Sequence, residues 1–145
     1  MGEKFRYRFY VPFVDTDAAG VVHFSNYPRY VERTEEELLR SGNLNYRVFN
    51  ERKIWLPRVE FFIQYLSPLR HNDLVEVVMW ISEIKEKSVR YSFEIHNLYT
   101  NKLSAKGTLT VVCAEINGRA IACPHELVEV WKKYHIEEKD IIENY

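Results

Sequence analysis

The chain has 145 residues, of which 46% are hydrophobic and 28% are charged, and its formal net charge is −1. This length suits one domain spanning residues 1–145, and this composition excludes a disordered chain. The near-neutral charge excludes a strong global field for nucleic acid, so no nucleic-acid partner is expected and any anionic ligand must be met by local basic residues. The N-terminus has no apolar run long enough for a signal peptide or a membrane span.

The first elements predicted in chain order are a strand and a long helix. Residues Phe5 to Val11 alternate aromatic and basic side chains, as in a strand with one polar face. A helix is predicted to start at about Tyr27, where Ser25 or Asn26 can cap it, and Gly42 can end it. Its predicted buried face carries Tyr27, Tyr30, Val31, Thr34 and Leu38, which recur at helical spacing.

A run of strands is predicted after the helix. The intervening segment, Arg47 to Lys53, is polar and indicates a loop or a short turn of helix. Alternating or continuous apolar patterns then predict four strands, at Val59 to Tyr65, Leu74 to Ile84, Val89 to His96 and Leu103 to Ala114. The pattern of Leu74 to Ile84 is apolar on both faces, which is typical of a strand that is buried on both sides.

The end of the chain is predicted to be helical. Pro124 opens a short amphipathic helix whose inward residues are Leu127, Val128 and Trp131. The charged tail from His135 indicates a further helical turn or a frayed end.

This order of elements predicts an α+β fold, in which one antiparallel sheet of about five strands packs against a helix. Such a sheet cannot both cover the helix and hide its own edges. We therefore expect a homo-oligomer, a dimer or a tetramer, that extends the sheet.

The two cysteines, Cys113 and Cys123, do not form a CxxC pair, and two thiols make no disulfide framework. They are interpreted as reduced thiols, which predicts a cytoplasmic protein. The five histidines are scattered without metal-ligand spacing, so neither a metal site nor a cofactor is expected.

The stretch DTDAAGVVHFSNY, Asp15 to Tyr27, places two carboxylates just ahead of the predicted helix. Aspartate is common in turns and caps, so Asp15 and Asp17 could simply shape a turn. For Asp15, a turn former and a residue supporting the site remain equally plausible. The small residues Ala18, Ala19 and Gly20 would let the backbone pass close to a ligand.

The longer string FVDTDAAGVVHFSNYPRYVERTEEELLR resembles the signature of the 4-hydroxybenzoyl-CoA thioesterase family, including its small acyl-CoA thioesterases. The resemblance covers about residues 5–135. It implies the hotdog fold, a sheet wrapped around a long central helix, and an acyl-CoA thioesterase that hydrolyses its substrate to a free acid and coenzyme A. It also implies an active site between two subunits.

The resemblance implies two catalytic groups. Asp17, the second acid of the motif, corresponds to the catalytic carboxylate, and the backbone N–H of Phe24 would polarise the thioester carbonyl. Some relatives carry Tyr-His where this chain has His23-Phe24. A thioester needs an attacking oxygen and a donor for the developing oxyanion, and an N–H at a helix start can be that donor. The carboxylate could attack directly or activate water.

The resemblance further implies that the basic stretch before the third of the four strands lies near the coenzyme A phosphates. In this chain the stretch contains Lys85, Lys87 and Ser88, with Glu86 where relatives with a basic triplet have Arg. A solvated hairpin is the plainer interpretation of these lysines. Five further residues are predicted to contact the substrate, namely His23, Tyr27, Arg58, Val59 and Phe61.

Three functions remain open at this point. Besides the thioesterase, the same fold could serve as a non-catalytic module that binds acyl thioesters, which would not need Asp17. A hydratase would need a histidine with an acid, and His23 keeps that alternative open. The sequence does not name the acyl group.

Overall fold

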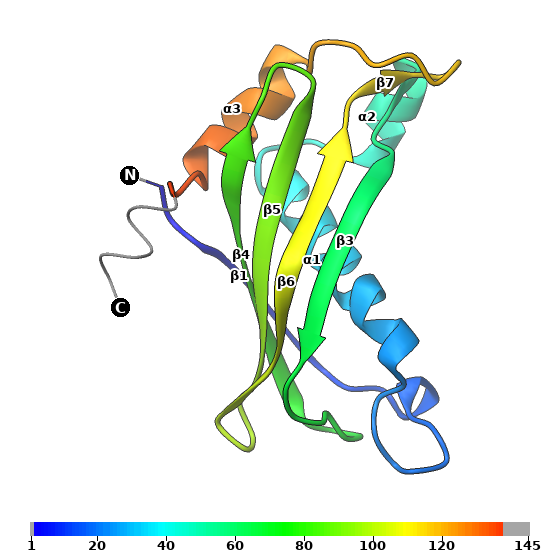
Figure 1. Ribbon diagram of the computed structural model, residues 1–145, viewed down its shortest axis with the longest axis vertical. Coiled ribbons are helices and arrows are strands. Elements are labelled where there is room, and N and C mark those ends of the chain that lie inside the picture. Colours follow the sequence, from blue (N-terminus) through cyan, green and yellow to red (C-terminus); the bar gives the residue numbers. More distant parts are fainter. Residues whose placement is uncertain (1, 138–145) are drawn as a thin grey trace.

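A long helix lies across one face of a five-stranded antiparallel sheet in the computed structural model, which describes residues 2–137 (Figure 1). The sheet order is β1-β4-β5-β6-β3. Its strands are β1 (Phe5–Tyr10), β3 (Arg58–Tyr65), β4 (Leu74–Ile84), β5 (Ser88–Asn97) and β6 (Lys102–Val112), and the helix is α1 (Tyr27–Ser41). The α+β architecture predicted from the sequence is confirmed.

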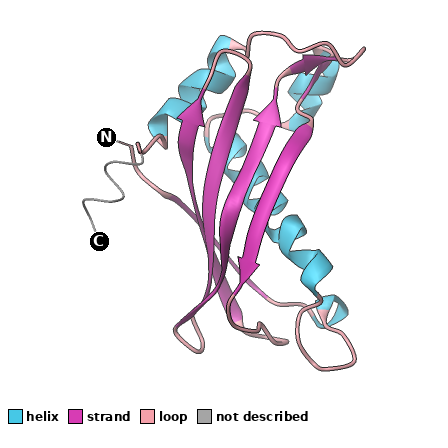
Figure 2. Cartoon of the chain, viewed as in Figure 1, coloured by secondary structure: helices cyan, strands magenta, loops and turns pink. Residues whose placement is uncertain are grey.

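Smaller elements close the ends of this layer pair (Figure 2). Strands β2 (Ile54–Trp55) and β7 (Ala114–Glu115) form a separate two-stranded sheet, and α2 (Tyr46–Glu51) is the short helix that the polar segment allowed. Helix α3 (His125–Lys133) buries Leu127 and Trp131, as predicted. Two 3-10 turns, η1 (Phe13–Asp15) and η2 (Phe24–Asn26), lie before α1.

Helix α1 packs on the sheet through the predicted face. Tyr27, Tyr30, Val31, Thr34 and Leu38 are all buried, and Gly42 is the C-cap. Asn26 is the N-cap residue of α1, one of the two predicted, but its side chain makes no capping hydrogen bond. The turn η2 leads directly into α1, and the side chain of His23 caps this turn instead.

The predicted fourth strand ends earlier than expected. Strand β6 stops at Val112, and Ala114 and Glu115 leave the large sheet to pair with β2. The strand ends there because the segment after Val112 folds back on itself, and the Ile121 N–H donates to the Cys113 carbonyl.

The prediction of reduced thiols is wrong, since Cys113 and Cys123 form a disulfide and no described cysteine is free. The fold-back after β6 brings their Cα atoms to 5.3 Å, which is within bridging distance. Sequence spacing could not reveal this because the pairing depends on the reversal of the chain. The cytoplasmic location was argued from free thiols, and it stays a prediction.

Among the described residues, no helix is long and apolar enough to cross a membrane. The N–H of Ile136 donates to the carbonyl of Ile81, which ties the start of the charged tail to β4. The rest of that tail, residues 138–145, lies outside the described residues.

Candidate active site

Asp17 lies in a tight loop between η1 and η2. Its N–H donates to the Val21 carbonyl at 2.9 Å, and the Gly20 N–H returns to the Asp17 carbonyl at 2.9 Å. Gly20 has a φ of 81°, a left-handed conformation that favours glycine. The Oδ1 atom of Asp17 accepts the Ala19 N–H at 2.8 Å, so one carboxylate oxygen shapes the turn. The other oxygen has no hydrogen-bond partner among the described residues, and the side chain is exposed.

The backbone N–H of Phe24 is available at the start of η2. The Ser25 N–H donates to His23 Nδ1 at 3.2 Å, and the Asn26 N–H donates to the His23 carbonyl at 2.9 Å. No acceptor among the described residues takes the Phe24 N–H. Because η2 continues into α1, this free donor points out at the positive end of the helix dipole.

Asp17 and Phe24 line one open cavity of about 410 Å³. Tyr27 also lines it, so three of the sequence-predicted residues come together here. Sequence reasoning missed Tyr65, the last residue of β3, whose hydroxyl donates to the Phe24 carbonyl at 3.1 Å. Its ring meets that of Tyr27 edge to face at 4.9 Å. The full lining is Asp17, Val21, Val22, Phe24, Tyr27, Tyr65, Leu66, Ser67 and Pro68.

The two tyrosines of the cavity stay protonated at neutral pH. Burial raises the pKa of Tyr27 to about 12, although a hydrogen bond with the Leu69 backbone opposes the shift. Burial also raises the pKa of Tyr65. Both phenols therefore keep their protons, which Tyr65 donates to the Phe24 carbonyl, and neither serves as a base in the cavity.

His23 lies next to the cavity but does not line it, and its Nδ1 is held by Ser25. It is exposed, and its Nδ1 holds both the Ser25 N–H and the Ser25 hydroxyl, at 2.7 Å from Oγ. Its ring stacks at a tilt on Phe24, with 4.7 Å between centroids. These contacts describe a cap for η2.

Asp15 lies behind the loop rather than in the cavity, and it is 2% exposed. Its Oδ2 accepts the Tyr30 hydroxyl at 2.7 Å, and its Oδ1 accepts from Arg29 Nη1 at 3.0 Å. Its carbonyl accepts the His23 N–H at 3.0 Å and the Asn26 side-chain amide at 2.9 Å. Asp15 therefore supports the loop from the buried side.

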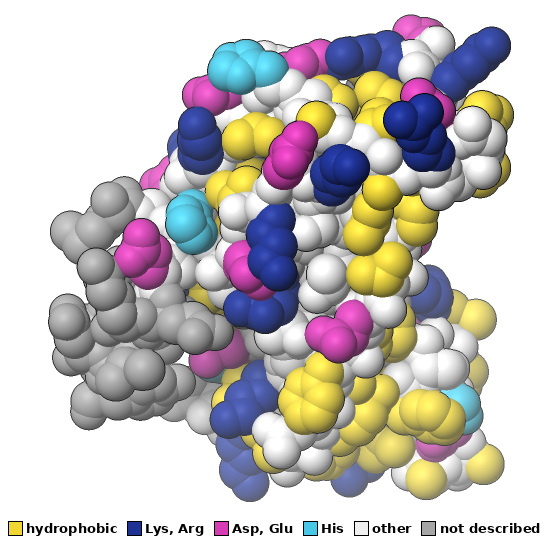
Figure 3. All heavy atoms as spheres, turned by 45° about the horizontal axis from the view of Figure 1, so that its top comes forward, with side chains coloured by type: hydrophobic (Ala, Val, Ile, Leu, Met, Phe, Trp, Pro, Cys, Tyr) yellow, Lys and Arg dark blue, Asp and Glu magenta, His cyan; other side chains and the backbone are white. Residues whose placement is uncertain are grey.

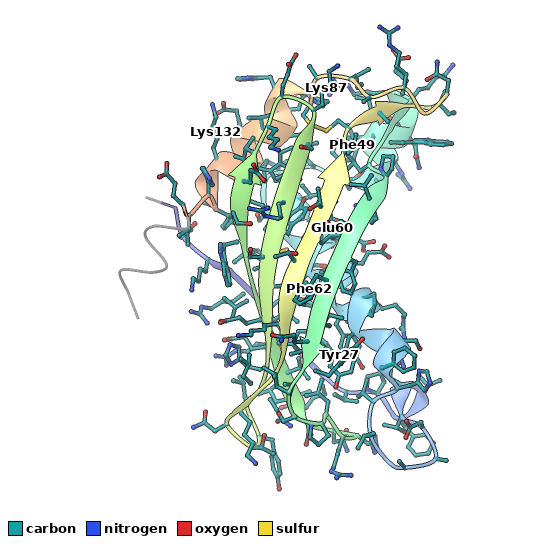
Figure 4. The ribbon with its side chains drawn as sticks, in the orientation of Figure 1. Tyr27, Phe49, Glu60, Phe62, Lys87 and Lys132 are labelled. Carbon is teal, nitrogen blue, oxygen red and sulfur yellow. A yellow bond between two sulfur atoms is a disulfide. The ribbon has the colours of Figure 1, made fainter. Side chains whose placement is uncertain are left out.

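The remaining predicted contacts lie at the other end of the sheet within one chain. Arg58 begins β3 and Tyr65 ends it, so they are on the order of 20 Å apart at about 3.3 Å per residue. The register places Ser88 beside the Arg58 end, and Lys85 and Lys87 form the exposed hairpin before it. Figure 4 shows Lys87 at the end of the sheet away from the start of α1. Charged side chains of both signs cover that end (Figure 3).

Arg58 is committed to a buried carboxylate that sequence reasoning missed. Glu35 on α1 is fully buried, and both of its oxygens accept from Arg58. The Tyr46 hydroxyl donates to Glu35 at 2.6 Å and accepts from Arg58 Nη2 at 2.7 Å. Burial raises the pKa of Tyr46, and the neighbouring Glu35 charge raises it further. The signal for Glu35 was its place on the apolar face, between Val31 and Leu38.

Two other predicted residues lie on β3. Phe61 stacks on Phe93, with 5.7 Å between ring centroids, and lines a separate cavity of about 250 Å³ between α1 and the sheet. Val59 is 58% exposed on this edge strand. The described His, Cys, Asp and Glu side chains form no cluster of three or more that could hold a metal ion.

Comparison with known proteins identifies relatives of this chain. A sequence profile described as the thioesterase-like superfamily matches residues 11–131. The acyl-CoA thioester hydrolase YbgC of Escherichia coli O6:H1 is 25% identical over 129 residues, which cover 89% of this chain and 96% of that protein.

Solved structures with the same fold are also found. A hypothetical protein from Aquifex aeolicus is 30% identical, with a TM-score of 0.82 over 88% of this chain and 98% of its own. A gentisyl-coenzyme A thioesterase is 28% identical, with a TM-score of 0.78 over 85% of this chain and 98% of its own. The hotdog fold expected from the sequence is thereby confirmed.

Proposed function

Because the chain belongs to the thioesterase-like superfamily, we propose that it hydrolyses an acyl-CoA thioester to the free acid and coenzyme A. Relatives named as acyl-CoA thioester hydrolase and as gentisyl-coenzyme A thioesterase support this reaction class. The observation that carries the proposal is the meeting of Asp17 with Phe24, which has a free N–H, in one open cavity.

In the proposed reaction the thioester carbonyl oxygen accepts the Phe24 N–H, which stabilises the negative charge that develops on it. The free Asp17 oxygen draws a proton from a water molecule, whose oxygen attacks the carbonyl carbon. The carbon–sulfur bond then breaks, and coenzyme A leaves as a thiolate that takes up a proton. Attack by Asp17 itself, through an acyl anhydride that water then cleaves, uses the same groups.

The position of His23 weighs against a hydratase. A hydratase would need an imidazole and an acid in one site, whereas His23 does not line the Asp17 cavity and its Nδ1 is held by Ser25. A non-catalytic binding module remains the alternative that an experiment must separate, because it would share the cavity.

Release of free thiol from a panel of acyl-CoAs tests the proposal. We expect the wild type to release thiol, and Asp17→Asn to lower kcat by at least about 100-fold, because it removes the group that activates the attacking oxygen. The melting temperature should stay unchanged, since Asp17 is exposed. Glu51→Gln, an exposed carboxylate on α2, is the control. Binding of acyl-CoA without thiol release would favour the binding module instead.

We also propose that two chains complete the site by pairing their β3 strands. Strand β3 is a free sheet edge that exposes Val59, Phe62 and Tyr65, at 45% to 58% of their surfaces. The other edge strand, β1, carries Arg6 and Arg8 on its exposed side, which discourages edge pairing. Figure 4 shows Phe62 on the free edge strand.

Antiparallel pairing of two β3 strands would reverse the ends of the partner. The partner's β4–β5 hairpin, which contains Lys85 and Lys87, would then lie at the Asp17 end of this chain. This geometry would reconcile the predicted phosphate contacts with their distance from Asp17 in one chain. Light scattering should show at least a dimer, and Phe62→Lys on the edge should dissociate it and reduce activity. A fully active monomer would contradict the proposal.

A further inference from the structure

We propose that Asp15 is a positioning residue, which holds the Asp17 loop and the Phe24 N–H in register with each other. This inference rests on the proposed function, since it assigns the two groups that Asp15 aligns. It concerns a side chain that does not line the cavity and therefore does not touch the substrate.

The backbone of Asp15 ties the loop to the oxyanion donor. Its carbonyl accepts the N–H of His23, the residue whose own carbonyl shares a peptide group with the Phe24 N–H. The same carbonyl accepts the Asn26 side chain at 2.9 Å. The His23 carbonyl lies in the same planar peptide group as the Phe24 N–H and accepts the Asn26 N–H at 2.9 Å. Asp15 holds both His23 and Asn26, so it fixes the direction of the Phe24 N–H.

The carboxylate of Asp15 ties residue 15, and with it the start of the Asp17 loop, to helix α1. The Tyr30 hydroxyl donates to Oδ2 at 2.7 Å, and Tyr30 is fully buried against the sheet, where its ring meets Phe9 at 4.7 Å. Burial raises the pKa of Tyr30, and the hydrogen bond to Asp15 raises it further, so the phenol remains a donor. Arg29 pairs with Oδ1 at 3.0 Å and balances the buried charge.

The contacts of Asp15 are the direct hydrogen bonds that join the Asp17 loop to the start of α1. Among the described residues, every hydrogen bond between segment 15–22 and segment 23–30 ends on Asp15. The loop is otherwise tied to the segment after β3, where the Val22 N–H donates to Leu69. Without the Asp15 contacts, no hydrogen bond would directly join the Asp17 loop to the segment that carries the Phe24 N–H, and the two would be held only through the chain and through residues 65–70.

Tyr30→Phe tests this role because it removes only the hydroxyl that holds Asp15. The matched control is Tyr91→Phe, which removes the hydroxyl of another fully buried tyrosine, bonded to Trp131 at 2.8 Å. We expect Tyr30→Phe to lower kcat by about 10- to 100-fold, since small misplacements of reacting groups cost that much, and to change KM by less than about 2-fold. The control should keep its kcat.

Hydrogen exchange measured on peptides that cover residues 15–26 gives a second readout, which needs no substrate. We expect faster exchange in Tyr30→Phe than in the wild type, and no change in Tyr91→Phe. In an Asp17→Asn background the kcat effect of Tyr30→Phe should shrink, because the two changes act on one unit.

Unchanged exchange in Tyr30→Phe would overturn the role of Asp15, whatever the activity. Faster exchange together with an unchanged kcat would overturn it as well, because the loop would then be ordered for stability alone. A wild type that releases no thiol would instead overturn the proposed function, so the two failures are distinguishable.

Discussion

Two buried carboxylates, Asp15 and Glu35, are held in the same manner at different places along α1. Each accepts a tyrosine hydroxyl and an arginine: Tyr30 and Arg29 for Asp15, and Tyr46 and Arg58 for Glu35. The partners of Asp15 come from the next 15 residues, whereas Arg58 lies 23 residues from Glu35 in another element. The Asp15 cluster joins a loop to a helix start, and the Glu35 cluster joins α1, α2 and β3.

This difference indicates that two clusters of similar chemistry have different roles, one in aligning the site and the other in holding the fold together. A cluster of local contacts can loosen without separating the sheet from α1, so its loss should affect the alignment of the site more than the fold. A cluster that joins three elements should behave in the opposite way, because the desolvation of Glu35 is compensated only when all three elements are in place.

The largest expected effect in the comparison of the two clusters is the loss of stability when Glu35 is replaced. Glu35→Gln should lower the free energy of unfolding by about 3 kcal/mol, because it leaves the partly buried Arg58 with only the exposed Glu32, at 3.9 Å, as a charge partner. For a domain of this length that corresponds to a fall of about 10 °C in Tm. Well below that temperature kcat should stay within about 2-fold of the wild type. Calorimetry at a fixed protein concentration, combined with thiol-release kinetics, measures both.

The matched control for this prediction is Glu36→Gln, the same change at the next position of α1. Glu36 makes no ion pair with a described residue, so its loss should shift Tm only slightly. A loss of kcat in Glu35→Gln as large as that expected for Tyr30→Phe would break the distinction between the two clusters.

The comparison also shows what the sequence could predict. The elements were predictable because their patterns are local: β5 alternates buried and half-buried residues, and α1 buries residues at helical spacing. The meeting of Asp17 and Phe24 was predictable from the motif, since seven positions separate them along the chain.

Contacts over longer distances were not predictable. The Glu35 cluster was missed because its partners, Tyr46 and Arg58, come from segments whose approach depends on the packing of the sheet. The disulfide was missed because the reversal of the chain between its cysteines, which sets their distance, is not visible in their spacing. Tyr65 was predicted as a strand residue, but its contact with Phe24 depends on where β3 ends relative to α1.

A second prediction concerns the disulfide, which belongs to the end of the sheet away from Asp17. Replacing both Cys113 and Cys123 by Ala should lower the free energy of unfolding by about 2–3 kcal/mol, because the bond closes a loop with a sequence separation of 10. We expect kcat to be unchanged. Reductant should destabilise the wild type by a similar amount and leave the double variant unaffected. A fall in kcat would connect this end to the reacting groups and weaken the comparison.

The smallest expected effect tests whether the β4–β5 hairpin, at the end of the sheet away from Asp17, contributes to binding of acyl-CoA. Lys85→Ala with Lys87→Ala should raise KM for an acyl-CoA about 5-fold at low salt and leave kcat unchanged, as expected for exposed charges near phosphate. The increase should shrink at high salt. The control changes Lys132 and Lys133 on α3, which also removes two exposed charges, and Figure 4 shows Lys132 on that helix. An equal increase in KM in both pairs would indicate a general effect of net charge.

Mixed oligomers turn this small effect into a test of the two-chain site. If the lysines of one chain serve the Asp17 of the other, an Asp17→Asn chain paired with a chain that lacks both lysines contains one complete site. Such a site joins the intact Asp17 of the second chain to the intact lysines of the first. Co-expression should therefore restore activity with the wild-type KM, which neither variant has alone. If the mixture shows only the raised KM, Lys85 and Lys87 act within their own chain, and the antiparallel pairing of β3 would no longer account for the position of the hairpin.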